Sequence, residues 1–396
     1  MHRSVISRYN KPAFCIPLIP FLLICLLVAI GVQLLYWLFI FSRTAFFTDV
    51  SFNNATDKLP GVSVIVAAWN ELENLQELLP ILDTQQYPDF EVIIVDDRSS
   101  DGSYDFLLTE CEGFRHVRFI RVDQTPKHIT AKKYALTLGI KAAHKDVVLV
   151  TDADCRPTSK DWIQLMVSNL TQEKSLVLGF SPYYRMSGFL NKFIRFETFY
   201  TALQYFSFAL VGAPYMGVGR NLLYRKSVFL ENKGFQSHQK IMGGDDDLFV
   251  NEVATTENVA VCIHPNAFTY SVPKTAFRDW YWQKRRHLSV GKGYRFRNKL
   301  MLGLLSLSHI LSWSLFLVLL PVALFQLPDP QLISWVGGAF GLRLLSSWGV
   351  MGLANRKLGN TTYWISLPLF DFLYVVYYVM FGIITLFSRR KLNQWK

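Results

Sequence analysis

The sequence predicts an α/β domain, built on a parallel sheet, that lies between membrane-spanning helices near the two ends of the chain. Two observations carry this prediction. Short apolar runs alternate with helical segments in the middle of the chain, and long uncharged runs lie before and after it. Of the 396 residues, 51% are hydrophobic and 18% are charged, and the mean hydropathy is +0.20. This composition is more apolar than that of most soluble proteins.

The first uncharged run covers residues 16–41 and is bounded by Lys11 and Arg43. As a helix with a rise of about 1.5 Å per residue, it is long enough to cross a hydrocarbon layer of about 30 Å. The basic residues before it also fit a secretory signal. However, the run is too long for the apolar core of a signal, and the sequence around Ser42 is a poor cleavage site. We therefore expect a retained anchor within a first region of residues 1–57.

The middle of the chain, residues 58–300, alternates strands and helices and is long enough for one large domain with its own core. Apolar, β-branched runs predict strands at residues 62–68, 91–95, 118–122 and 146–151. Helical spacing predicts helices at residues 72–82, 103–111 and 130–143. Near-continuous apolar strands in this order indicate a parallel sheet covered on both faces, and ligands of such sheets bind beyond the carboxyl ends of the strands.

The last region, residues 301–396, contains two apolar runs at 302–327 and 361–387, of which the second carries only Asp371. Both are long enough to span a bilayer. Residues 331–353 between them are apolar except for Arg343. A lone central arginine is unfavourable in lipid, so this segment spans, re-enters or lies along the interface. We expect two or three C-terminal spans, preceded by an interfacial segment near residues 275–300.

The net charge and the cysteines indicate which binding partners and which redox compartment to expect. The net charge is +11, from 41 basic and 30 acidic residues. Many basic residues flank apolar segments, where anionic headgroups are the nearest partner, so we expect a membrane and no nucleic acid. The cysteines show no paired spacing, which fits a reducing compartment and argues against structural zinc. They are Cys15, Cys25, Cys111, Cys155 and Cys262.

Two acidic turns follow predicted strands. Asp96 and Asp97 end the second strand and can accept hydrogen bonds from a base or a ribose, with local turn caps as the alternative. Asp152 and Asp154 flank a turn after the fourth strand. Carboxylates at i and i+2 of a turn can face one divalent cation that bridges the phosphates of a nucleotide diphosphate.

Two further motifs lie later in the middle region. Three aspartates, Asp245 to Asp247, precede the apolar Leu248-Phe249-Val250, which reads as the start of a helix. One of them can act as a general base towards an acceptor hydroxyl, and a simple helix cap is the alternative. Trp280 to His287 mix aromatic residues with cations. This pattern is typical of a membrane interface, and Lys284 or Arg286 within it can also bind a pyrophosphate.

Taken in this order, the motifs resemble those of the family 2 glycosyltransferases, among them bacterial and ceramide-glucosyltransferase-like enzymes. VSVIVAAWNE is similar to their first strand, VDDRSSDGS to their nucleotide turn, and DAD to their metal-binding DxD. GDDDL is similar to their (T/G)EDxDL motif, and QKRRH to their QxxRW motif. The resemblance covers about residues 60–290. It implies a GT-A fold, which is a Rossmann-like domain of nucleotide-diphospho-sugar transferases.

The resemblance also implies roles for individual residues. The nucleotide-sugar would be bound by Asp96, Asp97, Lys132, Asp152, Gln283 and Arg286. Asp152 and Asp154 would hold Mg2+ or Mn2+. Asp245 would be the catalytic base, with Asp246 as the alternative, because Gly244 stands where the family usually has Glu. His264 is either a third metal ligand or a core histidine.

The implied activity is an inverting hexosyl transfer from a UDP- or GDP-sugar to a lipid or lipid-linked acceptor, in cell envelope glycan synthesis. The catalytic domain would face the cytoplasm, at a bacterial inner membrane. The aromatic residues 196–219 form either buried core or a membrane-dipping helix, or an acceptor channel that opens to lipid. His287 replaces the family's final Trp, which favours a single transfer over the alternative, a processive polysaccharide synthase. The non-enzyme alternative is a membrane adaptor with a degenerate transferase fold.

Overall fold

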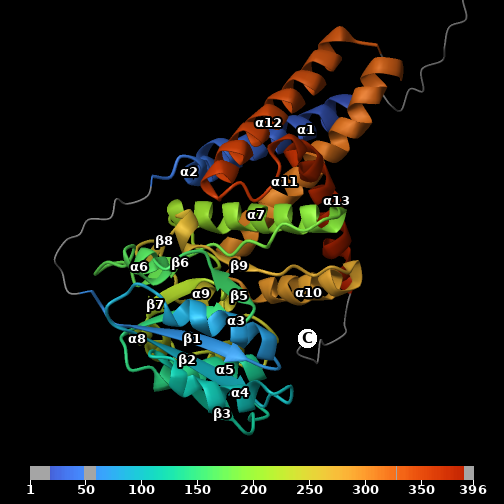
Figure 1. The fold of residues 1–396 in the computed structure, drawn as a ribbon. Coiled ribbons are helices and arrows are strands. Elements are labelled where there is room, and N and C mark those ends of the chain that lie inside the picture. The colour runs from blue at the N-terminus through green and yellow to red at the C-terminus, as the bar shows by residue number, and fades with distance from the viewer. Residues whose placement is uncertain (1–17, 49–58, 327, 388–396) are drawn as a thin grey trace, which may run out of the picture.

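The computed structural model describes residues 18–48, 59–326 and 328–387. Figure 1 shows two parts, a bundle of long helices and an α/β domain, with the helix α7 (Phe189–Leu210) crossing between them. The α/β domain contains the acidic motifs, and the bundle contains the long apolar runs.

The α/β domain is built on a mixed sheet that, within the described residues, has seven strands in the order β3-β2-β1-β4-β7-β6-β8. Their bounds are β1 (Val62–Ala68), β2 (Phe90–Asp97), β3 (Val117–Val122), β4 (Val147–Asp152), β6 (Leu176–Leu178), β7 (Leu222–Arg225) and β8 (Val259–Val261). The first four are parallel, as predicted. β7 is antiparallel to both β4 and β6, and β8 is parallel to β6.

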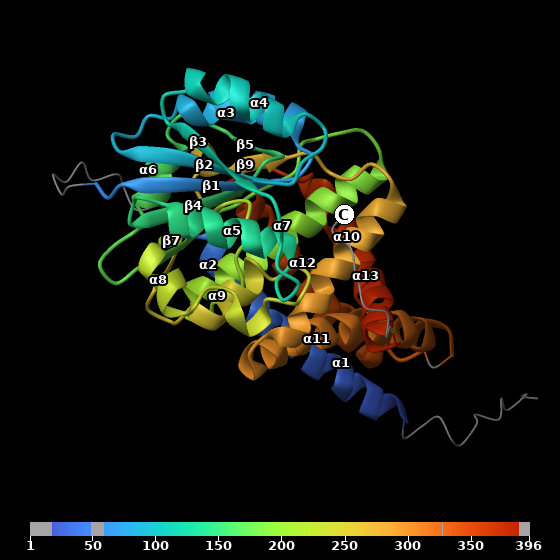
Figure 2. The same cartoon turned by 90° about the horizontal axis from the view of Figure 1, so that it is seen from below.

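The central strands are apolar throughout because both of their faces are covered. Val64 and Val66 of β1 pack in the same cluster as α3 (Leu72–Asp83), α4 (Ser103–Glu110) and α6 (Trp162–Val167). Ile65 of β1 instead packs with α5 (Ala131–Ala142) and α7. Figure 2 shows α3 and α4 on one side of the sheet and α5 on the other. Each buried Val or Ile side chain contributes roughly 1.5–3 kcal/mol.

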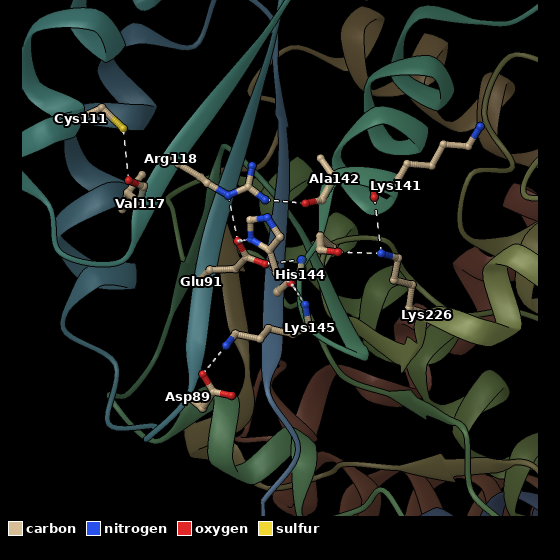
Figure 3. A network of polar contacts seen from close by, with 12 residues as sticks. Asp89, Glu91, Cys111, Val117, Arg118, Lys141, Ala142, His144, Lys145 and Lys226 are labelled. Atoms are coloured by element: carbon tan, nitrogen blue, oxygen red, sulfur yellow. Dashed lines mark hydrogen bonds and ion pairs between the residues drawn. The ribbon is translucent and has the colours of Figure 1, made fainter.

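Polar contacts fix the end of the sheet where β1, β2 and β4 begin (Figure 3). The guanidinium of Arg118 donates to the carbonyl of Ala142 at 2.6 Å, and the ammonium of Lys226 donates to the carbonyl of Ala143 at 2.6 Å. Both cations therefore satisfy carbonyls at the C-terminus of α5, where positive charge is favourable. Glu91 of β2 holds Arg118 in place, accepting from its Nε at 2.9 Å.

Shorter elements complete the α/β domain. β5 and β9 form a separate two-stranded antiparallel sheet. The remaining elements are β5 (Cys155–Pro157), β9 (Thr269–Ser271), α8 (Lys226–Glu231), α9 (Asp247–Val253), α10 (Phe277–Val290) and the 3-10 turns η2 (Cys111–Gly113), η3 (Gln236–His238), η4 (Pro265–Ala267) and η5 (Gly291–Gly293). Among the described cysteines, Cys111, Cys155 and Cys262 are buried and Cys25 is partly buried. Cys15 lies outside the described residues.

The helical bundle contains three stretches that are long and apolar enough to cross a membrane, namely Leu18–Ala45, Phe296–Gln326 and Trp364–Gly382. They match the expected N-terminal anchor and the two C-terminal spans, although residues 16 and 17 of the first run lie outside the described residues. The elements are α1 (Leu18–Leu35), η1 (Tyr36–Phe41), α2 (Ser42–Ala45), α11 (Phe296–Pro321), η6 (Val322–Gln326), α12 (Pro330–Lys357), η7 (Trp364–Ser366) and α13 (Leu367–Phe387).

The segment with the central arginine is the long helix α12, which lies beside α1 and α11 in the bundle (Figure 1). Arg343 is fully buried and forms an ion pair with Asp371 of α13. The two charges that interrupt the C-terminal apolar runs are therefore partners. The apolar stretch that begins at residue 196 forms most of α7, where it is largely buried up to Phe208, and it continues as a non-helical segment in which Val211 is 37% exposed.

Candidate active site

Two of the acidic turns meet at one edge of the sheet. β1 lies between β2 and β4, and its last residues pair with both neighbours: Ala68 is opposite Asp96 and Ala67 is opposite Asp152. The carboxylates therefore emerge side by side, at the point where successive connections leave the sheet in opposite directions. This is the position at which open α/β sheets bind ligands.

The turn after β2 is held against the start of α3. Asn70 and Arg98 adopt left-handed backbone conformations, with φ of 55° and 59°. The side-chain oxygen of Asn70 accepts from the backbone N–H of Ser100 at 2.8 Å, and Asp101 accepts from that of Leu72 at 3.0 Å. These bonds order the turn before any ligand arrives.

The two adjacent aspartates of this turn differ in their surroundings. Asp97 accepts from Nε of the neighbouring Arg98 at 2.8 Å. Asp96 is fully buried, and no donor among the described residues is aligned for a hydrogen bond with either of its oxygens. Burial raises the pKa of Asp96, and the nearby Ser99 offsets this in part. A buried carboxylate without an aligned donor is unfavourable, and this distinguishes Asp96 from Asp97.

The DxD turn leads from β4 into β5. Asp154 accepts from the hydroxyl of Ser271 on β9 at 2.9 Å, and Asp152 pairs with Lys132 at 2.8 Å. Burial raises the pKa of Glu71, and the charges of Asp154, Asp152 and Asp101 raise it further, so Glu71 lies near this turn.

The donor set of the DxD turn fits a magnesium or manganese ion. No group of three His, Cys, Asp or Glu residues within the described ranges can hold a metal by itself. Two carboxylates are nevertheless the usual protein share of a Mg2+ site, which is completed by water and substrate phosphates. His264 does not join them, because its Nδ1 accepts from the backbone of Asn266 and caps η4. His264 is half-buried and caps this turn, so it is not a core histidine either.

Lys132, in the first turn of α5, joins the DxD turn to the aspartate run. Its ammonium lies 2.8 Å from Asp152 and 3.1 Å from Asp245. Burial works to lower the pKa of Lys132, but Asp152 and Asp245 outweigh it and raise the pKa above its ordinary value. A charged lysine between two carboxylates is therefore part of the site.

The three aspartates at the start of α9 have different partners. Asp246 is the N-cap of α9: it accepts from the N–H of Asp247 at 2.8 Å and from that of Gly219 at 2.7 Å. Asp247 accepts from the hydroxyl of Tyr294 at 3.0 Å. Asp245 instead faces Lys132.

Their titration differs in the same way. Burial works to raise the pKa of Asp245, but Lys132 outweighs it and the pKa is lowered. Burial and the neighbouring charge of Asp246 raise the pKa of Asp247 well above its ordinary value. Burial and then the charge of Asp245 also raise the pKa of Asp246, so Asp245 is the member of the run whose ionised form is most favoured.

The glycines before this run explain its departure from the family's glutamate. Gly243 and Gly244 have φ of 83° and 77°. A Cβ at Gly244 would lie 2.7 Å from a side-chain carbon of Leu248. A left-handed backbone disfavours residues with a side chain, so this turn requires glycine.

Two residues near the site, Lys133 and Arg220, were not singled out by the sequence. The buried Lys133 donates to the carbonyls of His238 at 2.6 Å and Ile241 at 2.9 Å, and so holds the loop before Gly243. Burial lowers its pKa to about 8. Arg220 lies 4.5 Å over the ring of Tyr183, and its Nη1 is buried without a hydrogen-bond partner among the described residues. No local motif marks these positions, because long-range packing creates them.

The basic motif of α10 reaches the same site from the side of the helical bundle. Gln283 donates to the hydroxyl of Tyr183 at 3.4 Å, which places it next to Arg220. Lys284 forms a buried ion pair with Glu197 of α7 and therefore anchors α10. His287, in the last turn of α10, is exposed.

Comparison with known proteins finds a family and relatives that are similar to this domain. Residues 63–231 match the family described as glycosyl transferase family 2. A glycosyltransferase of Haloferax volcanii, AglE, is 29% identical over 118 residues. A poly-beta-1,6-N-acetyl-D-glucosamine synthase of Staphylococcus aureus is 31% identical over 120 residues. These matches cover 29% and 30% of this chain. They span only 37% and 28% of the two relatives.

A solved structure is similar over most of the chain. It is the mannosyltransferase PcManGT of Pyrobaculum calidifontis in complex with GDP-Man and Mn2+, with a TM-score of 0.59 and 17% sequence identity. The similarity covers 94% of this chain and 100% of that one. At this identity the similarity supports the fold, which is of the GT-A type with flanking helices.

Proposed function

Because residues 63–231 form a family 2 glycosyl transferase domain, we propose that this chain is an inverting glycosyltransferase that moves a sugar from a nucleotide-diphospho-sugar to a lipid or lipid-linked acceptor. The observation that carries the proposal is the position of Lys132, within 2.8 Å of Asp152 and 3.1 Å of Asp245. The ammonium of Lys132 thereby links the DxD turn, which suits a metal-bound diphosphate, to Asp245, which suits a general base.

The donor would lie at the carboxyl ends of β1, β2 and β4. Asp96 would accept from the nucleoside, because it is buried and without an aligned donor. Asp152 and Asp154 would hold Mg2+ or Mn2+, which when bound supplies charge that stabilises the departing nucleotide diphosphate. Lys132, Arg220 and Arg286 would add positive charge around the same leaving group, in a partly desolvated site where such charge is most effective.

The acceptor would be activated from the other side of the site. Asp245 is held ionised by Lys132, and so can take the proton of an acceptor hydroxyl as that oxygen attacks the anomeric carbon. The bond from the anomeric carbon to the diphosphate breaks in the same step, and configuration is inverted. No covalent enzyme intermediate is required.

A membrane acceptor is supported by the helices around the domain. Three helical stretches are long enough to cross a bilayer, and α10, which carries Gln283 and Arg286, packs against α13. The active site would therefore lie close to the membrane surface, with the domain in the cytoplasm, where nucleotide-sugars are made.

The test is a screen of UDP- and GDP-sugars for metal-dependent nucleotide release by the purified full-length protein. We expect Asp154→Ala and Asp245→Asn to reduce release by about 100- to 10,000-fold, the usual contribution of a metal ligand or general base. Asp105→Asn, an exposed aspartate on α4, is the matched control and should behave as wild type. Wild-type protein that releases no nucleotide with any donor would contradict the proposal.

A processive synthase is the second candidate, favoured by the similarity to poly-beta-1,6-N-acetyl-D-glucosamine synthases. Product length separates the two. A single transfer gives one defined product at all times of reaction, whereas a processive enzyme gives long chains while most acceptor is still unused.

A further inference from the structure

We propose that Arg185, Lys192, Arg195 and Tyr363 form a site for the phosphate group of a membrane lipid, next to the proposed metal site. The inference deepens the proposed function and rests on it for the link between this site and the acceptor. We call these four residues the Tyr363 site. They come from three places in the chain: the loop after β6, the first half of α7, and the connection between α12 and α13.

The geometry is three cations around one aromatic ring. The guanidinium carbon of Arg185 lies 4.5 Å from the ring centroid of Tyr363. The ammonium of Lys192 lies 5.9 Å from the same centroid, and the guanidinium carbon of Arg195 lies 6.0 Å from it. Each cation is within the range of a cation–π contact. The ring therefore gathers three positive charges in one small volume.

No acidic residue within the described ranges forms an ion pair with any of the three. Arg118, Lys145 and Arg156, also in the α/β domain, each have a carboxylate partner. Arg195 is the most demanding member, because it is only 5% exposed and its described hydrogen bond goes to a neutral carbonyl, that of Thr361. Burial, and then the charge of Arg185, lower its pKa. Like charges gathered in this way are unfavourable unless an anion joins them.

Ordinary snorkelling does not account for this arrangement. Lysines and arginines near a membrane usually extend separately towards the headgroups, with their charged ends in water. Here Arg195 is buried, and the three charged groups converge instead of spreading. Arginine forks are well suited to phosphate, and a phosphate monoester carries enough charge to balance more than one of them.

The position of the Tyr363 site points to a lipid. Tyr363 directly precedes Trp364, the first residue of the third stretch that can cross a membrane. Tyr363, Trp364 and Phe189 are 41%, 55% and 60% exposed, so apolar surface lies beside the cations. A ligand with a phosphate head and an apolar chain would satisfy both features. A free nucleotide would leave the apolar surface uncovered.

The Tyr363 site is also next to the proposed metal site. The backbone N–H of Tyr184, the neighbour of Arg185, donates to the carbonyl of Ser271 at 3.0 Å. The hydroxyl of Ser271 in turn donates to Asp154 at 2.9 Å. The rings of Tyr184 and Tyr270 lie 5.2 Å apart between the two sites. A lipid held at Tyr363 would thus present its head close to the donor.

The test measures binding of dodecyl phosphate to the full-length protein in neutral detergent, with dodecanol and inorganic phosphate as separate probes. The variant is Arg185→Gln with Lys192→Gln, which removes two exposed cations and leaves the buried Arg195 in place. The matched control is Arg115→Gln with Lys160→Gln, which removes the same charges from exposed positions elsewhere. We expect dodecyl phosphate to bind at least about tenfold more weakly to the variant and unchanged to the control.

The other probes complete the test. Dodecanol should bind weakly and equally to all forms. Phosphatidylglycerol in mixed micelles is then used as a competitor of dodecyl phosphate. If it competes as well as dodecyl phosphate itself, the natural ligand is a bilayer phospholipid. If the protein binds dodecyl phosphate more tightly than phosphatidylglycerol, the natural ligand is a lipid with a terminal phosphate. Unchanged dodecyl phosphate binding in the variant overturns the inference, as does inorganic phosphate that binds as tightly as dodecyl phosphate. Metal-dependent nucleotide release is measured on the same samples, so that a failure of the proposed function is seen separately.

Discussion

The aspartates before α9 show how neighbouring carboxylates acquire different roles. Asp246 has both oxygens bound to backbone N–H groups, at 2.7 and 2.8 Å, and so stabilises the start of the helix. Asp245 is bound by the mobile end of a lysine side chain instead. A base must release one interaction to accept a proton, and a lysine contact can rearrange more readily than a helix cap.

We therefore predict opposite phenotypes for substitutions at Asp246 and Asp245. Asp246→Ala removes an N-cap and should destabilise the protein by about 0.5–2 kcal/mol while retaining metal-dependent nucleotide release. Asp245→Asn should keep the thermal midpoint within about 2 °C of wild type and lose release. Thermal unfolding and nucleotide release on the same preparations provide the measurement. Full activity of Asp245→Asn, together with an inactive but stable Asp246→Asn, would assign the base to Asp246.

At this scale the sequence identified residue types but not their partners. The sequence grouped Asp96 with Asp97. Only the fold shows that Asp97 accepts a hydrogen bond from Arg98, while Asp96 is buried without an aligned donor. The sequence also passed over Arg220 and Lys133. Their environment depends on Tyr183 and on the carbonyls of His238 and Ile241, which are distant in the chain.

Helix α5 and the strands around it depend on the polar contacts of Figure 3, at the end of the sheet away from the site. Glu91 accepts from Ser63 at 2.7 Å, from the N–H of His144 at 2.7 Å and from Arg118 at 2.9 Å. Burial works to raise the pKa of Glu91, but these donors outweigh it and lower the pKa to about 2.

The lowered pKa predicts a stability that depends on pH. The ionised form is favoured in the folded state, so the contribution is complete above the unfolded pKa of about 4.3 and is lost as pH falls through that value towards 2. After allowance for solvent screening, we expect Glu91→Gln to lose about 1–2 kcal/mol at pH 7.

Thermal midpoints in detergent between pH 7 and pH 3 check this prediction. The difference in thermal midpoint between wild type and Glu91→Gln should decrease as the pH falls. Glu110 is an exposed glutamate on α4, and Glu110→Gln should have the thermal midpoint of wild type at every pH. A difference between wild type and Glu91→Gln that is constant over the whole range would mean that the ionised carboxylate is not the stabilising species.

The elements differ in how far their sequences predict them. β1 was predicted with the bounds that the structure has, and α3, α4 and α5 within one or two residues, because each carries a full apolar pattern. β6 and β8 have three residues each, which is too short for any periodicity. The reversal at β7 follows from the path of α7 across the domain, which no local pattern encodes.

On the scale of the whole molecule, the bundle joins the two ends of the chain around a buried polar cluster. Arg343 of α12 and Asp371 of α13 form its centre, and Gln33 of α1 accepts from Arg343 at 3.2 Å. Nε2 of His309 on α11 lies 3.1 Å from the carbonyl of Asp371. All four residues are at most 1% exposed. One buried polar cluster thus connects α1, which precedes the α/β domain in the sequence, with α11, α12 and α13, which follow it.

A buried ion pair contributes little when it replaces a well-packed apolar pair, but the loss of one partner leaves an uncompensated charge. We therefore predict that Arg343→Met and Asp371→Leu each destabilise the full-length protein by about 3–5 kcal/mol, and that the double variant recovers much of this loss. The measurement is the thermal midpoint of each variant in the same detergent.

If the pair also sets how α13 holds α10, through Tyr377 and Trp280, the single variants should lose nucleotide release at temperatures where they remain folded. Single variants as stable and as active as wild type would show instead that the bundle is held by apolar packing alone.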